Sequence, residues 1–259
     1  MHASVKIMDI EVDMMTNDVF IEKMNEYLTD DQLDVIFFAS TNMLDRATKD
    51  ESYRALIDQA ELFLPGEEAL LTTHHVEMLE AGGMVVSCRS LGMMLEHLKE
   101  QDRTLYIIAQ NEEEIWKLEM YCTAMQPELK VVGAYVYDEE MEDDAVVNEI
   151  NSHTPDMILL NLPTGIQEKW IMDHVALLNA KLCIAIGGVS GLILSEQKET
   201  PEWVKKLGLE GAYQRLVKEQ TVQKDFKARI FRKKIVQYNN IQLDEALHDS
   251  TQEKDDDIL

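Results

Sequence analysis

Hydrophobic positions along the chain follow two patterns: short continuous apolar runs, and longer segments with apolar residues three or four positions apart. Continuous runs rich in Val, Ile and Phe are typical of buried strands, and the longer periodic segments indicate amphipathic helices. The first pattern predicts strands over residues 5–12, 33–40, 62–65, 84–87, 103–110, 129–136, 156–162 and 181–188. The second predicts helices over residues 18–28, 53–62, 91–101, 112–125, 139–151 and 166–178.

Strands that alternate with helices indicate an α/β fold with an open, mostly parallel, Rossmann-like sheet and helices on both faces. No Pro/Gly/Ser-rich linker and no repeat interrupts residues 1–200, so we expect a single α/β domain there. Residues 201–240 predict a basic helical C-terminal appendage. Residues 241–259 are polar and acidic, which is typical of a disordered tail.

The composition and net charge of the chain argue against several classes of function. The 259 residues carry a formal net charge of −25, which argues against a nucleic-acid partner because phosphate recognition needs a basic face. No apolar segment approaches the ~20 residues that span a bilayer, and the first residues lack a signal-peptide pattern. Cys88, Cys122 and Cys183 are dispersed, and the adjacent His74 and His75 have no third ligand at a familiar spacing. We therefore expect a cytoplasmic protein with reduced thiols and without a bound metal.

Polar side chains follow three of the predicted strands. Residues 40–42 are Ser-Thr-Asn, residues 66–68 are Gly-Glu-Glu, and residues 164–168 end in the pair Gln167 and Glu168. The carboxyl ends of parallel strands lie at one edge of the sheet, where open α/β sheets bind ligands. The sequence therefore predicts that these three segments form one crevice.

Each segment also has a structural interpretation. Ser, Thr and Asn before a helix are more often caps than ligand contacts. Glu67 could act as a general base, although a carboxylate in the first turn of a helix is the commoner role. Gln167 and Glu168 could bind sugar hydroxyls, or they could simply begin a helix.

A basic stripe at residues 224–234 stands out in this acidic chain, and it precedes an apolar position at Ile235. Three roles remain open for it: contact with an anionic membrane surface, binding of a diphosphate, or packing against the protein's own acidic surface or tail. Its cationic residues are Lys224, Lys227, Arg229, Arg232, Lys233 and Lys234.

Taken together, these motifs resemble the WecG/TagA/CpsF glycosyltransferases, glycosyltransferase family 26, over about residues 35–235. The family pattern GsPkQEkWi is similar to PTGIQEKWI at residues 163–171, and its GLEWlyRL block is similar to GLEGAYQRL at residues 208–216. Family positions retained in this chain are Asn42, Gln167, Glu168, Trp170, Glu210 and Arg215.

The resemblance implies transfer of a hexosamine, such as N-acetylmannosamine, from a UDP-sugar to a polyprenyl-diphosphate-linked acceptor during synthesis of a cell-surface polysaccharide. It implies no tightly bound cofactor, a location at the inner membrane face reached through residues 224–234, and self-association. It also implies a catalytic role for Gln167 beside a carboxylate base. The substrate contacts implied are Ser40, Thr41, Asn42, Gln167, Glu168, Arg215, Arg229 and Arg232.

Several family positions differ in this chain. The Asp of the family's PDG motif, its proposed base, is Gly66 here, and the family's Gly is Glu67. A Gly-Gly pair of the family is Ala109-Gln110 here, so side chains occupy places where backbone would meet phosphate. Two hypotheses follow: a divergent transferase in which Glu67 becomes the base, or a catalytically degenerate relative that binds a sugar nucleotide or regulates a partner enzyme.

Overall fold

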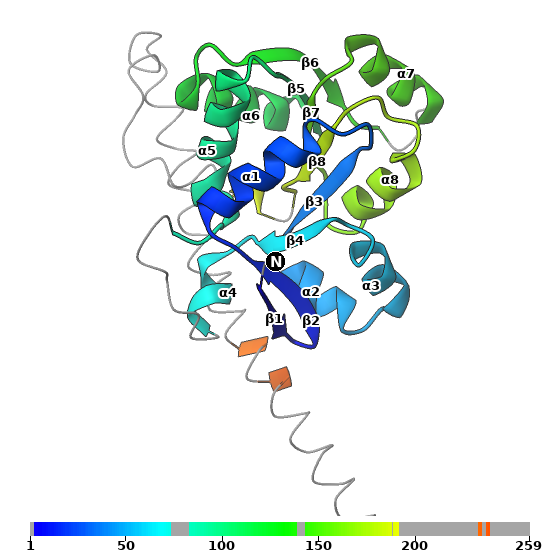
Figure 1. Cartoon of the computed structure of the whole chain (residues 1–259). Coiled ribbons are helices and arrows are strands. Elements are labelled where there is room, and N and C mark those ends of the chain that lie inside the picture. The colour runs from blue at the N-terminus through cyan, green and yellow to red at the C-terminus, as the bar shows by residue number, and fades with distance from the viewer. Residues whose placement is uncertain are drawn as a thin grey trace, which may run out of the picture.

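A six-stranded parallel sheet forms the centre of the protein and confirms the predicted α/β fold (Figure 1). The computed structural model describes residues 3–73, 83–138, 143–187, 189–191, 233–234 and 237–238. The strand order is β4-β3-β8-β7-β5-β6, and every pairing is parallel. The strands are β3 (Asp34–Ala39), β4 (Leu62–Pro65), β5 (Thr104–Ala109), β6 (Lys130–Val136), β7 (Met157–Asn161) and β8 (Leu182–Ala185).

The strands are buried as their continuous apolar runs predict. Every residue of β3, β4, β7 and β8 is buried, because helices cover both faces of the sheet. The edge strand β6 is only half-buried. The hydrophobic core therefore follows the centre of the sheet.

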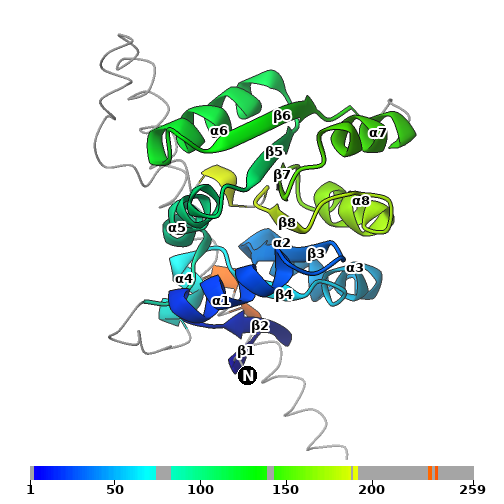
Figure 2. The same ribbon diagram turned by 45° about the horizontal axis from the view of Figure 1, so that its top comes forward.

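Helices lie on both sides of the sheet (Figure 2). One side carries α1 (Asn17–Tyr27), α5 (Ser87–Glu100) and α6 (Glu112–Met125). The other side carries α3 (Glu51–Ile57), α7 (Asp143–His153) and α8 (Ile166–His174), and the short α2 (Thr41–Ala47) packs against α3. The helix α4 (Glu68–Thr73) follows β4. Within the ranges that the structure describes, every helix is too short or too polar to cross a lipid bilayer.

The prediction of one strand over residues 5–12 was wrong. The chain forms an antiparallel hairpin of β1 (Ala3–Ile7) and β2 (Ile10–Met14). Its two turn residues, Met8 and Asp9, have φ angles of 53° and 60°, which is the backbone region that tight hairpin turns require. The turn has no glycine and interrupts an apolar run, so no residue pattern marks it.

The hairpin covers the outer edge of the sheet. The carboxylate of Asp13 in β2 accepts a hydrogen bond from the Phe63 N–H in β4, with an Oδ2 to N distance of 2.9 Å. An unpaired strand edge is prone to association with other chains, and this side-chain contact occupies part of the β4 edge.

The strand predicted over residues 84–87 was also wrong. Met84 forms only an isolated bridge with Thr16, and α5 already begins at Ser87. Val85 and Val86 are buried, and the Val85 N–H donates to the Met15 carbonyl at 3.0 Å, which explains why this apolar segment suggested a strand. The appendage and tail predicted at 201–240 and 241–259 lie outside the described residues, except for helical positions 233–234 and 237–238.

Candidate functional site

The loops after β3, β4, β7 and β8 meet at the carboxyl edge of the sheet. The Gly66 N–H donates to the Ala39 carbonyl at 3.0 Å, which joins the loops after β4 and β3. The Gly187 N–H donates to Oε1 of Gln167 at 2.9 Å, which joins the loops after β8 and β7. The prediction that residues 40–42, 66–68 and 164–168 gather at one edge of a parallel sheet is confirmed, and the single crevice that they should form stays a prediction.

Glu67 is buried between two of these loops, with 5% of its surface exposed. Its Oε1 accepts a hydrogen bond from the Thr41 N–H at 3.2 Å, and its Oε2 accepts one from the Thr41 hydroxyl at 3.2 Å. Thr41 is the first residue of α2, where unpaired backbone N–H groups and the helix dipole favour a negative charge. The carboxylate of Glu67 is therefore held in a fixed place at the start of α2.

The backbone around Gly66 explains why the carboxylate stands at position 67. A Cβ atom on Gly66 would lie 2.6 Å from the Ala39 carbonyl oxygen and 2.5 Å from Cγ1 of Val189. The first contact is with backbone, which cannot move aside as a flexible side chain can. An Asp at position 66 is therefore incompatible with this loop, and Glu67 is the acidic residue that the loop directs into the carboxyl edge.

Gln167 and Glu168 are both fully buried. Gln167 accepts from the Gly187 N–H and donates from Nε2 to Oε1 of Glu168 at 3.0 Å, while Oε2 of Glu168 accepts from the Gly165 N–H. A Cβ atom on Gly187 would lie 1.7 Å from the Leu162 carbonyl oxygen, so only glycine fits there. Both side chains thus fix the loops around β7 and β8, and a substrate contact by either remains a prediction.

The three residues after β3 have separate roles. The Ser40 hydroxyl accepts from the Met43 N–H at 3.3 Å and caps α2, as the structural interpretation of this segment predicts. Thr41 binds Glu67, and Asn42 is exposed. Of the three, Asn42 is therefore the side chain most open to a ligand.

Arg46 is a residue of this edge that the sequence did not indicate. Its guanidinium lies over the Tyr53 ring at 4.5 Å and directly over Gly165, whose φ is +95°. The family pattern GsPkQE has proline at the position of Gly165, and proline cannot adopt a positive φ. The loop before α8 therefore differs from the family pattern, and Arg46 occupies the space above it. Burial, together with the Glu168 carboxylate, raises the pKa of Tyr53.

A second polar contact, between Asn161 and Glu114, lies where β5 and β7 are neighbours. The helices that follow these strands, α6 and α8, lie on opposite sides of the sheet. Open α/β sheets bind ligands at such positions. Asn161, the buried last residue of β7, donates from Nδ2 to Oε2 of Glu114 in the first turn of α6 at 2.7 Å. The one polar residue in the apolar run MILLNL is the signal that could have indicated Asn161.

The remaining predicted site residues have different outcomes. Arg215, Arg229 and Arg232 lie outside the described residues. Lys234 is described, and its Nζ contacts Oδ2 of Asp45 in α2 at 2.9 Å. For Lys234, packing against the protein's own acidic surface is thus the observed alternative. Across the described ranges, no three His, Cys, Asp or Glu side chains cluster closely enough to bind a metal ion.

Comparison with known proteins assigns the family. The sequence model of the Glycosyl transferase WecG/TagA/CpsF family matches residues 5–224. The chain belongs to this family. It is 20% identical over 217 residues to the N-acetylglucosaminyldiphosphoundecaprenol N-acetyl-beta-D-mannosaminyltransferase of Staphylococcus aureus strain NCTC 8325 / PS 47, a match that covers 83% of this chain and 85% of the relative. The enzyme of the same name from strain MRSA252 is 21% identical over 218 residues, with the same coverage.

The family resemblance inferred from the sequence is thereby confirmed, and the chain is a member of a glycosyltransferase family. Its low identity to the relatives agrees with the altered loop positions, since Gly66 and Gly165 both stand where the family pattern has other residues.

Proposed function

We propose that this protein transfers an N-acetylmannosamine-like hexosamine from a UDP-sugar to a polyprenyl-diphosphate-linked acceptor, in the synthesis of a cell-surface polysaccharide. Membership of the family supports the transfer of a sugar. The names of the relatives describe a lipid-linked acceptor and transfer of an N-acetylmannosaminyl group, and they support the substrate class. The observation that carries the proposal is the Glu67 carboxylate, held by two hydrogen bonds from Thr41 at the carboxyl edge of the sheet.

The proposed reaction is a direct displacement. Glu67 takes the proton from a hydroxyl of the acceptor sugar, the hydroxyl oxygen forms a bond to the anomeric carbon of the donor, and the bond to UDP breaks. A general base must lie about 2.6–3.2 Å from the proton donor or act through one water. The two hydrogen bonds from Thr41 hold both carboxylate oxygens of Glu67 in place relative to α2, as such a short distance requires.

The other proposed residues position and bind the substrates. Gln167 and Glu168 shape the edge through their contacts with the loops after β7 and β8. We propose that Ser40, Thr41 and Asn42 contact the UDP-sugar, which is the donor substrate. Arg215, Arg229 and Arg232 are proposed to bind the diphosphate groups, with residues 224–234 touching the inner membrane face.

The test is release of UDP from UDP-N-acetylmannosamine in the presence of a lipid-linked acceptor. Replacing Glu67 with Gln keeps the volume and one acceptor oxygen for Thr41 but removes the base. We expect the rate to fall about 100-fold or more, since general-base catalysis contributes ~10²–10⁴. Glu22→Gln, at an exposed position of α1, is the matched control and should keep the parent rate. An unchanged rate for Glu67→Gln would remove Glu67 as the base.

A second candidate function has its own observation. A Gly-Gly pair of the family pattern is replaced by Ala109, at the end of β5, and Gln110. Side chains therefore stand where backbone would meet phosphate, and this favours a protein that binds a nucleotide sugar with weak or no turnover. Calorimetry with UDP-N-acetylmannosamine separates the two functions. Binding without UDP release would support the degenerate relative, and turnover at ordinary enzyme rates would exclude it.

A further inference from the structure

Arg46 is a cation at the carboxyl edge that has no role in the reaction proposed above. It lies in α2, one turn after Asn42, and these two exposed residues face the same side of the helix. The Arg46 side chain is 47% exposed, whereas the ring over which it lies belongs to the buried Tyr53. Its guanidinium is therefore open to solvent at the edge where the substrates are expected.

Two contacts orient the guanidinium. Its Cζ lies 4.5 Å from the centre of the Tyr53 ring, and an aromatic face is a favourable neighbour for a planar cation. Its Nε lies 3.8 Å from Oδ2 of Asp50, one turn further along the chain. A long and exposed ion pair of this kind contributes little to stability. These contacts therefore place the guanidinium without neutralising it in a buried pair.

The loop before α8 leaves room for the guanidinium because Gly165 has no side chain. A Cβ atom on Gly165 would lie 1.9 Å from Nη1 of Arg46 and 2.9 Å from its Cζ. The φ of +95° at Gly165 also excludes proline, the residue of the family pattern. Gly165 therefore allows Arg46 to lie against the loop that leads into Gln167 and Glu168.

The terminal nitrogens of Arg46 are placed to bind a ligand. Within the ranges that the structure describes, the guanidinium has one ion pair, with Asp50, and this pair uses Nε. Nη1 and Nη2 carry N–H groups in a planar fork, which matches two oxygens of a phosphate or a carboxylate. An oxyanion of a substrate is thus the ligand that the chemistry of this side chain favours.

We propose that Arg46 is a substrate-binding residue that holds an oxyanion of the nucleotide-sugar donor. This inference deepens the proposed function and rests on it. The oxyanion belongs either to the diphosphate or to a carboxylate on the sugar, because the guanidinium fork binds both in the same way. A donor held by Arg46 lies over α2 and the loop before α8, at the edge that also carries Glu67.

Calorimetric titration of the full chain at low salt tests the proposal with three ligands. They are UDP, UDP-N-acetylmannosamine, and the uronic acid of that nucleotide, whose sugar carries a carboxylate. Arg46→Gln removes the charge and the fork, and we expect it to bind roughly 10- to 100-fold more weakly, the range for losing hydrogen bonds to charged groups. Arg46→Lys keeps the charge but not the fork, so it should also bind more weakly than the parent.

Arg54→Gln is the matched control. Arg54 in α3 forms the same kind of ion pair, from Nε to Oδ2 of Asp58 at 3.9 Å, but its Nη2 donates to the Asp9 carbonyl in the hairpin turn. The variant removes the same charge from the chain and should keep the parent affinity for all three ligands. The urea unfolding midpoints of Arg46→Gln and Arg54→Gln should both stay close to that of the parent.

The pattern across the ligands identifies the oxyanion. Equal weakening for UDP and both sugar nucleotides by Arg46→Gln would assign Arg46 to the diphosphate, and weakening for the uronic acid alone would assign it to the sugar carboxylate. Unchanged affinity for all three ligands, or equal weakening by Arg54→Gln, would overturn the proposal.

The titration measures binding and not transfer, so two kinds of failure can be told apart. An active parent whose Arg46→Gln variant keeps full affinity would contradict this inference alone. Selective weakening by Arg46→Gln in a parent that transfers no sugar would contradict the proposed reaction alone. A parent that binds none of the three ligands would contradict both.

Discussion

The buried carboxyl and amide groups at the two edges of the parallel sheet differ in how completely they are hydrogen-bonded. At the carboxyl edge, Glu67, Gln167 and Glu168 are buried and bound to backbone N–H groups or to one another. At the amino edge, one oxygen of the buried Asp34, Oδ2, has no hydrogen-bond partner. The Tyr53 hydroxyl, under Arg46 at the carboxyl edge, also has no hydrogen-bond partner. Buried polar groups are normally paired, so Asp34 is the exception among these buried carboxyl and amide groups.

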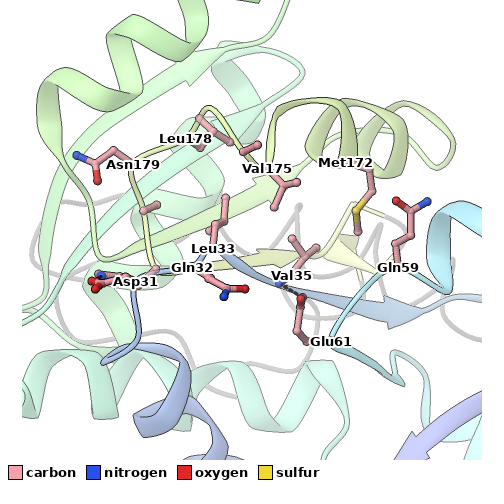
Figure 3. Close-up of a pocket in the computed structure, with 13 residues that line it drawn as sticks. Asp31, Gln32, Leu33, Val35, Gln59, Glu61, Met172, Val175, Leu178 and Asn179 are labelled. Atoms are coloured by element: carbon pink, nitrogen blue, oxygen red, sulfur yellow. Dashed lines mark hydrogen bonds and ion pairs between the residues drawn. The ribbon is translucent and has the colours of Figure 1, made fainter.

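The amino edge contains a pocket. A pocket of about 450 Å³ lies between the start of β3, the residues before β4 and the end of α8 (Figure 3). Val35, Met172 and Leu178 line it from the apolar side, and Glu61, whose Oε2 accepts from the Val35 N–H at 2.5 Å, lies at its rim. The family motifs at residues 66–68 and 164–168 lie at the opposite edge. The family motifs therefore place the candidate site at the edge opposite this pocket.

Replacing Gly187 with Ala should cause the largest loss of stability. The added Cβ would lie 1.7 Å from the Leu162 carbonyl oxygen, so the loops after β7 and β8 must separate. We expect the free energy of unfolding to fall by about 4 kcal/mol, the upper range for single substitutions. Gly83→Ala is the control, because its φ of +70° is strained but its Cβ meets nothing closer than 3.5 Å. Similar urea midpoints for both variants would contradict the tight approach.

Replacing Gln167 with Leu compares the two edges directly. The change keeps a similar volume but leaves the half-buried Gly187 N–H unpaired and removes a donor from the buried Glu168. We expect a loss of about 2–3 kcal/mol in urea unfolding, since an unsatisfied buried group costs ~1–3 kcal/mol. Gln59→Leu is the control, because Gln59 is exposed and lies near the amino edge. Substitutions of exposed side chains usually change the free energy of unfolding by no more than about 0.5 kcal/mol. Equal losses would show that Gln167 has no special place in the structure.

Replacing Asp34 with Asn should stabilise the protein in a pH-dependent way. Burial, followed by the charges of Asp30 and Glu61, raises the pKa of Asp34 to about 7, and Lys23 opposes this shift. The unfolded chain releases this proton near pH 4, so the native state loses stability as the pH rises from about 4 to about 7. Asn cannot ionise and removes this loss.

The Asp34→Asn protein should therefore exceed the parent by about 1–2 kcal/mol at pH 8 and equal it at pH 4, since one pKa unit corresponds to ~1.4 kcal/mol and neighbouring acids share the charge. Asp31→Asn, at a fully exposed side chain, is the control and should show no such dependence. A constant difference between pH 4 and pH 8 would contradict the raised pKa.

Much of the fold could be predicted from the sequence because its signals are local. Continuous apolar runs such as DVIFFA and MILLN occur only where both sides of a strand are covered, and they indicated the parallel sheet. Parallel strands in turn placed residues 40–42, 66–68 and 164–168 at one edge. The hairpin turn at Met8 and Asp9 could not be predicted, because these residues adopt a positive φ and no glycine marks the turn.

The contacts within the site could not be predicted, because they join residues that are far apart in the chain. Thr41 and Glu67 are 26 residues apart, Gln167 and Gly187 are 20 apart, and Asn161 and Glu114 are 47 apart. The family resemblance supplied the residue types but not the burial of Gln167 and Glu168 or the place of Arg46 over Gly165. Only packing decides whether a polar side chain faces a ligand or fixes a loop.

The most direct test of the central claim is hydrogen exchange of the full chain with and without UDP-N-acetylmannosamine. If the sugar nucleotide binds at the carboxyl edge, amide exchange should slow at residues 40–42, 66–68 and 162–168. Exchange should not change at residues 31–33, 59–61 and 179–181 around the amino-edge pocket. Protection of the amino-edge residues, with the carboxyl edge unaffected, would contradict the account.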